Sequence, residues 1–355
     1  MPSLIKKTIL CAFAVIWTPI AAEAYLRVFA PVDMMPRFIE EGEHGIRRNI
    51  PGERYVHSSA EYRIDFAINE QGIRDPRAFE KPKPKDVFRI VLLGDSFAMG
   101  YGVKYEDSVP ARLETALSVL LKRPVEVVNL GVSGFGTAEE LIALENDGWT
   151  FEPDLVMAYW HNSDPFDNVR SQLYKLQGAD LVRVNDTYLP AVALRTWLFS
   201  FPVYRFMAEH SQVYNWIRGD MGTYVRRLLF IFNSLRAGDS VEASDDPDVI
   251  SEPIKLNLAL LALIQKTCAA RDVGFFIVEV PRNPEPGSYV STFPYEAMRK
   301  SGYAFDIVTP LSLFERNYTS DGGSLIYWQR SAGHWTPSGA AAVTEAIVEY
   351  FKARK

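Results

Sequence analysis

The sequence has only two cysteines and five histidines among its 355 residues, and these shortages exclude several kinds of site. The cysteines are Cys11 and Cys268, and Cys11 lies in an apolar run at the N-terminus. Neither a disulfide framework nor a cysteine-based metal site is therefore expected. The histidines show no spacing that is typical of metal ligands. We expect no bound metal and no cofactor.

Long basic runs are also absent. The chain has 38 Lys and Arg residues against 44 Asp and Glu residues, a formal charge of −6, so no nucleic-acid partner is expected. Gly100-Tyr101-Gly102 lacks the third glycine of a dinucleotide-binding loop, and no Gly-Lys-Ser/Thr phosphate loop occurs. A hydrophobic share of 48% is typical of a globular protein with a substantial core.

The N-terminus has the composition of an export signal or a membrane anchor. Lys6 and Lys7 precede the mostly apolar residues 8–22, and Ala22-Glu23-Ala24 matches a small-x-small cleavage pattern. Residues 1–24 are therefore either a signal peptide cleaved near Ala24 or part of an anchor over residues 5–29. Under both interpretations the positive-inside rule places the rest of the chain outside the cytoplasm, in the periplasm or at the cell surface.

Three further regions follow. Residues 25–86 are polar and rich in proline, which indicates a juxtamembrane stalk and a lead-in. Residues 87–355 form the main domain, with a helical insertion at about 165–254. The insertion contains aromatic-rich helical patterns around 197–207 and 214–232, and an acidic segment at 239–248 that favours a solvated loop. The aromatic helices are interpreted as a lid, a membrane-facing surface or a plain core-packing insert.

In the main domain, strand patterns alternate with helix patterns, which predicts an α/β fold with a parallel sheet. Thr137 with Glu140 is typical of a capping box that opens a helix. Apolar runs predict strands at 88–93, 125–130, 154–160 and 274–281, and helical spacing predicts helices at 113–121, 137–144, 256–264 and 343–351.

Polar residues follow these strands, at the edge where open parallel sheets bind ligands. They fall into four blocks, which are Gly94-Asp95-Ser96-Phe97, Asn129-Leu130-Gly131-Val132-Ser133-Gly134, His161-Asn162-Ser163-Asp164 and Gly333-His334-Trp335-Thr336-Pro337.

In order and placement, the four blocks resemble the consensus blocks of the SGNH (GDSL) hydrolase superfamily, over roughly residues 64–355. The segments 68–74, 89–96 and 100–103 are similar to the exported bacterial members. The resemblance implies a three-layer, flavodoxin-like fold and ester hydrolysis. It also implies that Ser96 is the nucleophile and His334 its base, with an oxyanion hole made by the backbone N–H groups of Ser96 and Gly134 and the side-chain amide of Asn162. His161 is unusual for the family and is interpreted as lining the pocket.

One departure from the family pattern concerns the acid. Members of the family carry an aspartate two or three residues before the catalytic histidine, where this chain has Ala332 and Ser331. Three hypotheses remain: a Ser-His dyad, an acid from elsewhere such as Asp321 or Asp164, or a weakened enzyme kept for binding.

The expected function is that of an exported serine esterase without a cofactor. Its substrate would be an acyl or acetyl ester on a small molecule, a glycan such as a cell-wall polymer, or a lipid, and the N-terminus would allow membrane association. Two alternatives remain open: an O-acyltransferase that acts on a polysaccharide, and a non-catalytic carbohydrate-binding protein on the same fold.

Overall fold

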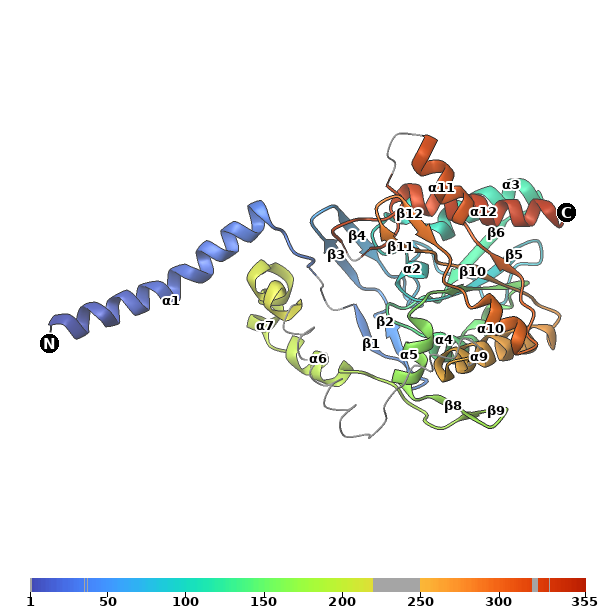
Figure 1. Ribbon diagram of the computed structural model, residues 1–355, viewed down its shortest axis with the longest axis horizontal. Coiled ribbons are helices and arrows are strands. Elements are labelled where there is room, and N and C mark those ends of the chain that lie inside the picture. Colours follow the sequence, from blue (N-terminus) through green and yellow to red (C-terminus); the bar gives the residue numbers. More distant parts are fainter. Residues whose placement is uncertain (1, 35, 37, 220–249, 321–324, 332) are drawn as a thin grey trace. The chain divides into compact units, whose positions relative to one another are not determined.

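A computed structural model of the chain describes residues 2–34, 36, 38–219, 250–320, 325–331 and 333–355, and Figure 1 labels its elements. The acidic segment 239–248, expected to be a loop, lies outside the described residues. The chain divides into two units. The first comprises residues 1–37, 56–64 and 194–245, and the second comprises residues 38–55, 65–193 and 246–355.

Five parallel strands form the central sheet of the second unit, in the order β13-β10-β7-β5-β6. Numbered along the chain and read from the β6 edge, this order is 2-1-3-4-5, the flavodoxin-like arrangement. The predicted fold class is therefore confirmed. The strands are β5 (Phe88–Leu93), β6 (Val125–Asn129), β7 (Leu155–Trp160), β10 (Gly274–Glu279) and β13 (Ile307–Val308).

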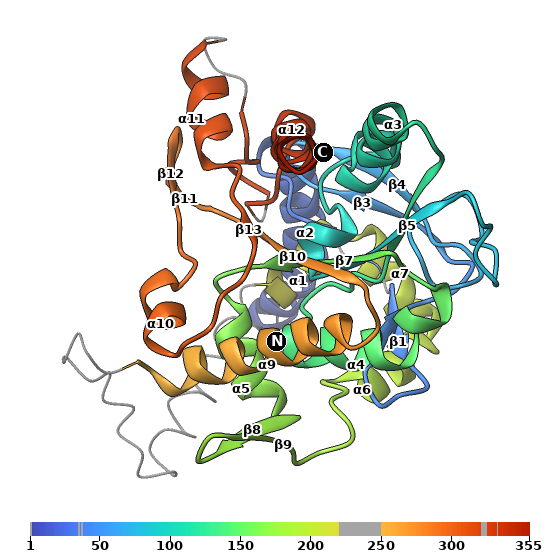
Figure 2. The same cartoon turned by 90° about the vertical axis from the view of Figure 1, so that its right-hand side faces the viewer.

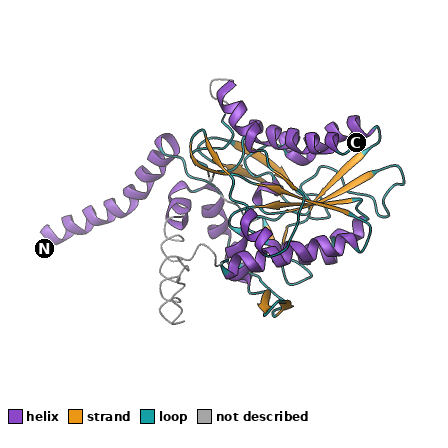
Figure 3. Cartoon of the chain, turned by 45° about the vertical axis from the view of Figure 1, so that its right-hand side comes forward, coloured by secondary structure: helices purple, strands orange, loops and turns teal. Residues whose placement is uncertain are grey.

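Helices cover both faces of this sheet. Figure 2 shows α3 and α12 on one side of the strands and α4, α5 and α9 on the other, and Figure 3 shows the strands between the two layers. A parallel sheet that is covered on both faces needs strands that are apolar on both faces, and every residue of β7 is buried. The covering helices are α3 (Val109–Leu121), α4 (Thr137–Asn146), α5 (Asp164–Ser171), α9 (Glu252–Ala269) and α12 (Pro337–Ala353).

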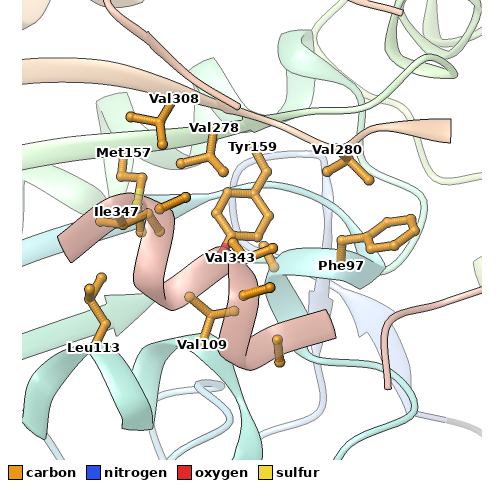
Figure 4. Close-up of a cluster of buried hydrophobic side chains, with 14 of the residues drawn as sticks. Phe97, Val109, Leu113, Met157, Tyr159, Val278, Val280, Val308, Val343 and Ile347 are labelled. Atoms are coloured by element: carbon orange, nitrogen blue, oxygen red, sulfur yellow. The ribbon is translucent and has the colours of Figure 1, made fainter. Parts of the chain in front are cut away.

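The core under α3 and α12 is shown in Figure 4. Leu113 from α3 and Val343 and Ile347 from α12 belong to one buried cluster with Met157 of β7 and Val278 of β10. Each such side chain contributes about 1.5–3 kcal/mol when it is removed from water. This burial holds α12, which follows His334 in the chain, against the sheet.

The second unit also contains shorter elements. Residues 38–55, which the sequence assigns to a stalk, belong to this unit and carry an antiparallel strand pair. The shorter elements are β1 (Ile39–Glu41), β2 (Arg47–Asn49), α2 (Ser96–Met99), β8 (Tyr174–Gln177), β9 (Asp180–Arg183), β11 (Arg282–Glu285), β12 (Ser288–Val290), α10 (Tyr295–Lys300) and α11 (Leu311–Ser320), with 3₁₀ turns at Tyr105–Asp107 and Gly148–Phe151.

The first unit contains the N-terminal helix and the aromatic helices. Residues 5–29 are long and apolar enough to cross a membrane, with a mean hydropathy of 1.8, a test that signal sequences also pass. The aromatic pattern around 197–207 forms two helices, and the one at 214–232 is described only as far as 219, in a helical run that begins at 212. The named helices are α1 (Pro2–Phe29), α6 (Val192–Phe199) and α7 (Pro202–His210). The strands β3 (Arg54–Ser58) and β4 (Arg63–Ala67) pair with each other and have residues in both units.

The predicted capping box of α4 is wrong by one residue. The N-cap is Gly136, whose N–H donates to Glu139 Oε2 at 3.3 Å. Thr137 lies inside the helix, and its hydroxyl oxygen accepts a hydrogen bond from Asn257 Nδ2 at 2.8 Å. The hydroxyl of Thr137 therefore bonds to a side chain of α9 instead of capping its own helix. Glu140, the other residue of the predicted box, lies on a buried face of α4.

The packing of α3 yields a test of the core. Leu113→Ala removes a fully buried side chain and should lower the free energy of unfolding by about 2–5 kcal/mol, because the surrounding core cannot close the cavity. Val119→Ala on the same helix alters a side chain that is 77% exposed, and it should change stability by less than about 0.5 kcal/mol. Urea titration followed by circular dichroism measures both, and equal effects would contradict the packing described.

Candidate active site

The turn after β5 presents Ser96. Gly94 has φ +153°, and a Cβ atom there would lie 2.6 Å from the Cβ of Ala98, so the turn needs glycine. Asp95 caps α2 through Oδ1, which accepts the N–H of Phe97 at 2.8 Å. Ser96 is therefore the first residue of α2, where a backbone N–H has no partner within its own helix. Its side chain is half-buried at the carboxyl end of the strand.

His334 is fixed by a short antiparallel contact just before α12. Tyr327 and Trp335 form an isolated β-bridge, and the N–H of Trp328 donates to the carbonyl of His334 at 2.8 Å. Thr336 then caps α12 with its side chain. The helix anchored in the core thus sets the position of the imidazole.

These two residues, 238 positions apart in sequence, meet in the structure. His334 Nε2 lies 2.8 Å from Ser96 Oγ. The imidazole also packs against two rings, with centroid distances of 4.8 Å to Phe97 and 5.2 Å to Tyr101. A serine hydroxyl within hydrogen-bond reach of an imidazole nitrogen is the arrangement that activates a nucleophile.

Gly134, from the second block, lies on a loop that Arg47 holds. Arg47 Nη1 donates to the carbonyl of Ser133 at 3.3 Å, and Nη2 donates to the carbonyl of Gly134 at 2.7 Å. The same guanidinium pairs with Glu139 at 2.8 Å. In a trans peptide the N–H points opposite to the carbonyl, so the bond to Ser133 directs the N–H of Gly134 away from Arg47. Gly134 itself has φ +80°, which strains any residue with a side chain.

Asn129 connects this loop to the turn that carries Ser96. Its Nδ2 donates to the carbonyl of Ala98 at 2.6 Å, and its Oδ1 accepts the N–H of Gly131 at 2.9 Å. Asn49, from β2, donates to the carbonyl of Gly131 at 3.2 Å. Arg47 and Asn49 were not predicted as site residues, because they lie in the segment predicted to be a stalk and a single sequence offers no signal for either contact.

The third block follows β7, the neighbour of β5 in the sheet. Asn162 is half-buried at this edge. His161 next to it packs its ring 5.1 Å from that of Phe97 and lies 2.9 Å from Ser163 Oγ through Nδ1. The backbone N–H of His161 donates to Asp164 Oδ2 at 2.9 Å. The third block is thus held in place by hydrogen bonds among its own residues and by the ring of Phe97.

The structure describes one of the two candidates for the acid, Asp164, and not the other, Asp321. Asp164 is buried, and burial together with the nearby carboxyls of Glu140 and Asp95 raises its pKa well above the usual value. Burial thus opposes the ionisation of Asp164, and its Oδ2 already accepts the backbone N–H of His161. Ser331 is fully buried, and Ala332 and Asp321 lie outside the described residues.

Glu140 on α4 is buried behind the nucleophile turn. Within the described residues, neither of its carboxyl oxygens has a hydrogen-bond partner. Burial, followed by the charges of Asp95 and Glu139, raises its pKa well above the usual value. The same described residues contain no group of three His, Cys, Asp or Glu side chains placed to hold a metal ion.

No protein-family model and no curated protein match the chain. Its structure is similar to a protein described as lipolytic and of the G-D-S-L family, from Desulfitobacterium hafniense, with 11% identity over 74% of this chain and 98% of that one, at a TM-score of 0.38. It is also similar to a GDSL-like lipase from Bacteroides thetaiotaomicron, with 12% identity over 78% of this chain and 94% of that one, at a TM-score of 0.38. A third similar structure is a two-domain esterase active on acetylated mannans, with 13% identity over 75% of this chain and 49% of that one, at a TM-score of 0.40. All three likenesses are distant.

The buried carboxyl of Glu140 predicts a pH dependence of stability. A carboxyl whose pKa is raised by folding favours the folded state below its unfolded pKa, near 4.3, and this contribution is lost as the pH rises through the folded pKa. Glu140→Gln should remove a slope of up to about 1.4 kcal/mol per pH unit, so the variant gains stability relative to wild type between pH 5 and 8.

Thermal unfolding of both proteins across that pH range measures the effect. Glu285→Gln, at an exposed position, is the matched control and should follow the wild-type curve. Parallel curves for wild type and Glu140→Gln would contradict the assignment.

Proposed function

We propose that this chain is a serine hydrolase of the SGNH type that cleaves an ester through an acyl-enzyme on Ser96. The observation that carries the proposal is the distance of 2.8 Å between Ser96 Oγ and His334 Nε2. A neutral imidazole with its proton on Nδ1 accepts the serine proton through Nε2 as the oxygen attacks the ester carbonyl. The proton then passes to the leaving alcohol, and water releases the acyl group by the same route.

The oxyanion of the tetrahedral intermediate would be held by the backbone N–H groups of Ser96 and Gly134 and by the amide of Asn162. Two features of the second loop support the role of Gly134: the positive φ and the contact of Arg47 with the carbonyl of Ser133, which together fix the direction of the N–H. Each donor of this kind lowers the barrier by about 2.7–4 kcal/mol.

We further propose that the centre works as a Ser-His dyad. The raised pKa of Asp164 argues against that residue as the acid. The rings of Phe97 and Tyr101 pack against the imidazole and restrict its rotation, which is one of the two tasks that an aspartate performs in a triad. Asp321 remains the alternative acid.

We propose as substrate an acyl or acetyl ester, and we expect a glycan or a lipid to carry it. An acyl-enzyme can also be intercepted by a sugar hydroxyl, so O-acyl transfer is the second reaction to test. Turnover of an acetate ester with and without an acceptor sugar distinguishes the two, since a transferase forms acetylated sugar and a hydrolase forms acetate.

The nucleophile is tested by labelling with a serine-reactive fluorophosphonate. Wild type should react and Ser96→Ala should not, because the label bonds to the activated oxygen. Hydrolysis of an acetate ester should fall at least about 10³-fold in Ser96→Ala and His334→Ala, and about 10²–10³-fold in Asn162→Ala.

Ser301→Ala alters an exposed serine of the same unit and is the matched control, which should label and turn over like wild type. Equal labelling of wild type and Ser96→Ala, or of neither, would leave only the carbohydrate-binding alternative.

We also propose that α1 is retained as a membrane anchor, with the rest of the chain outside the cytoplasm. Glu23 accepts hydrogen bonds from the backbone N–H groups of Gln212 at 2.9 Å and Val213 at 3.0 Å, and from Ser211 Oγ at 2.9 Å. It also pairs with Arg27 at 2.8 Å. Cleavage after Ala24 would remove the acceptor of three donors, including two at the start of a helix.

Retention predicts that the protein purified from membranes has the mass of a chain that still contains residues 1–24, and that an alkaline carbonate wash does not extract it. Intact-mass spectrometry measures the first outcome directly. A mature chain that begins at Tyr25 would contradict the anchor and support the cleaved-signal alternative.

A further inference from the structure

The aromatic helices of the first unit carry several large apolar side chains that are exposed to solvent. On α6, Trp197 is 59% exposed, and on α7, Phe206 is 64% exposed. We refer to the exposed apolar side chains of these helices and of the helical run 212–219 as the aromatic face. Its main members are Leu194, Trp197, Phe201, Val203, Phe206 and Trp216.

Helical spacing groups these side chains on single sides of their helices. Leu194 and Trp197 are three residues apart on α6, and Val203 and Phe206 are three residues apart on α7. The side of α7 that packs inward is a different one, since Ala208 is fully buried. On α7 the exposed apolar side is therefore additional to the side that packs, and packing among the described residues does not account for it. Exposed apolar side chains grouped in this way are typical of an interaction site.

The same helices are tied to one end of α1. Glu23 binds the start of the run 212–219, as described above, and Arg27 donates to the backbone carbonyl of His210, the last residue of α7. Val32, just beyond α1, donates its N–H to Gln212 Oε1 at 2.7 Å. All of these contacts lie within the first unit.

The length of the apolar helix sets the depth of these contacts in a bilayer. A hydrocarbon core of about 30 Å takes about 20 helical residues at 1.5 Å each. Counted from Thr8, directly after Lys6 and Lys7, such a span reaches Arg27. Arg27 thus lies at the far boundary of the core, where the headgroups begin, and the end of α7 that it binds lies at the same depth.

We propose that the aromatic face lies in the headgroup layer of the phospholipid bilayer that holds α1, on the extracytoplasmic side. The inference rests on the proposed anchoring of α1. Trp side chains are favoured at this depth, where the apolar ring meets hydrocarbon and the indole N–H meets water, and Phe and Leu are typical of the apolar side of an interfacial helix.

Site-specific fluorescence tests the depth of the face in the full-length chain. A Cys11→Ala background removes the exposed cysteine. Cys268 is fully buried and burial raises its pKa to about 12, so it does not compete for the label. An environment-sensitive thiol dye is attached at Val203→Cys, on the face, or at Arg205→Cys, its matched control. The two exposed positions lie about 160° apart around α7, and Arg205 is about 100° from Phe206.

The labelled proteins are reconstituted in vesicles of phosphatidylcholine and phosphatidylglycerol with nitroxide-bearing lipids. The dye at 203 should be quenched by the lipid nitroxide at least about twofold more than the dye at 205, and iodide in the water should show the reverse order, as expected for one side of an interfacial helix. Equal quenching at both positions by iodide, with none by lipid, would overturn the proposal. Protection at 203 from both quenchers, with a dimer on light scattering, would assign the face to a second copy of the chain instead.

The anchor and the hydrolase have separate readouts. A dye on the native Cys11 reports α1, and quenching by nitroxides deep in the acyl chains shows that the helix is inserted. Quenching at Cys11 without lipid quenching at 203 would overturn the aromatic face while the anchor stands, and the reverse result would support the face alone. Absence of quenching at both positions would overturn the face and the anchor together. Ser96→Ala should leave all of these signals unchanged, so loss of the proposed activity is independent of them.

Discussion

The hydrogen bond between Ser96 and His334 depends on the direction of the strands. Because β5 and β7 are parallel neighbours, the loops that follow them leave the sheet at the same edge, and the loop after β6 does so on the other side of β5. Three blocks far apart in sequence therefore converge without long connections. His334 arrives differently, at the start of a helix whose buried side chains press it onto the sheet beside α3. Packing of α12 thus sets the distance between the two reacting groups.

The parts of this arrangement that were predictable from sequence are those with a strong local pattern. Four apolar runs predicted the long strands, and the polar residues that follow these runs predicted the edge of the sheet where the candidate site lies. The two-residue strand β13 has no such pattern, because it is too short to show a period. Arg47 was unpredictable for a different reason: its contact with Glu139 and the loop at Gly134 is a tertiary one, across 92 positions from Glu139. The predicted capping box was wrong for the same reason, because the hydroxyl of Thr137 accepts a hydrogen bond from the distant Asn257.

The carboxyls behind the nucleophile raise an electrostatic question for any oxyanion formed there. Several acidic side chains from α4 and α5 lie close to Asp95, and a fully ionised cluster would oppose a second negative charge on the substrate. Burial counteracts part of this conflict, because it raises the pKa of Glu140 and Asp164 and so opposes full ionisation of the cluster. Glu139 is compensated in another way, by the paired guanidinium of Arg47. The same arginine thus both balances a buried charge and orients the loop of Gly134.

A dyad has chemical consequences for the esters that this centre can cleave. The aspartate of a triad orients the imidazole and also stabilises the imidazolium that forms as the serine attacks, and its loss costs about 10⁴ in rate, or about 5.5 kcal/mol. In the proposed dyad, the rings of Phe97 and Tyr101 would replace the first function only, because packing restricts rotation but their faces supply much less than a full negative charge. The imidazolium would therefore form at greater cost. Esters whose alcohol leaves readily need less proton transfer in the transition state, so a dyad favours them over esters of poorly acidic alcohols.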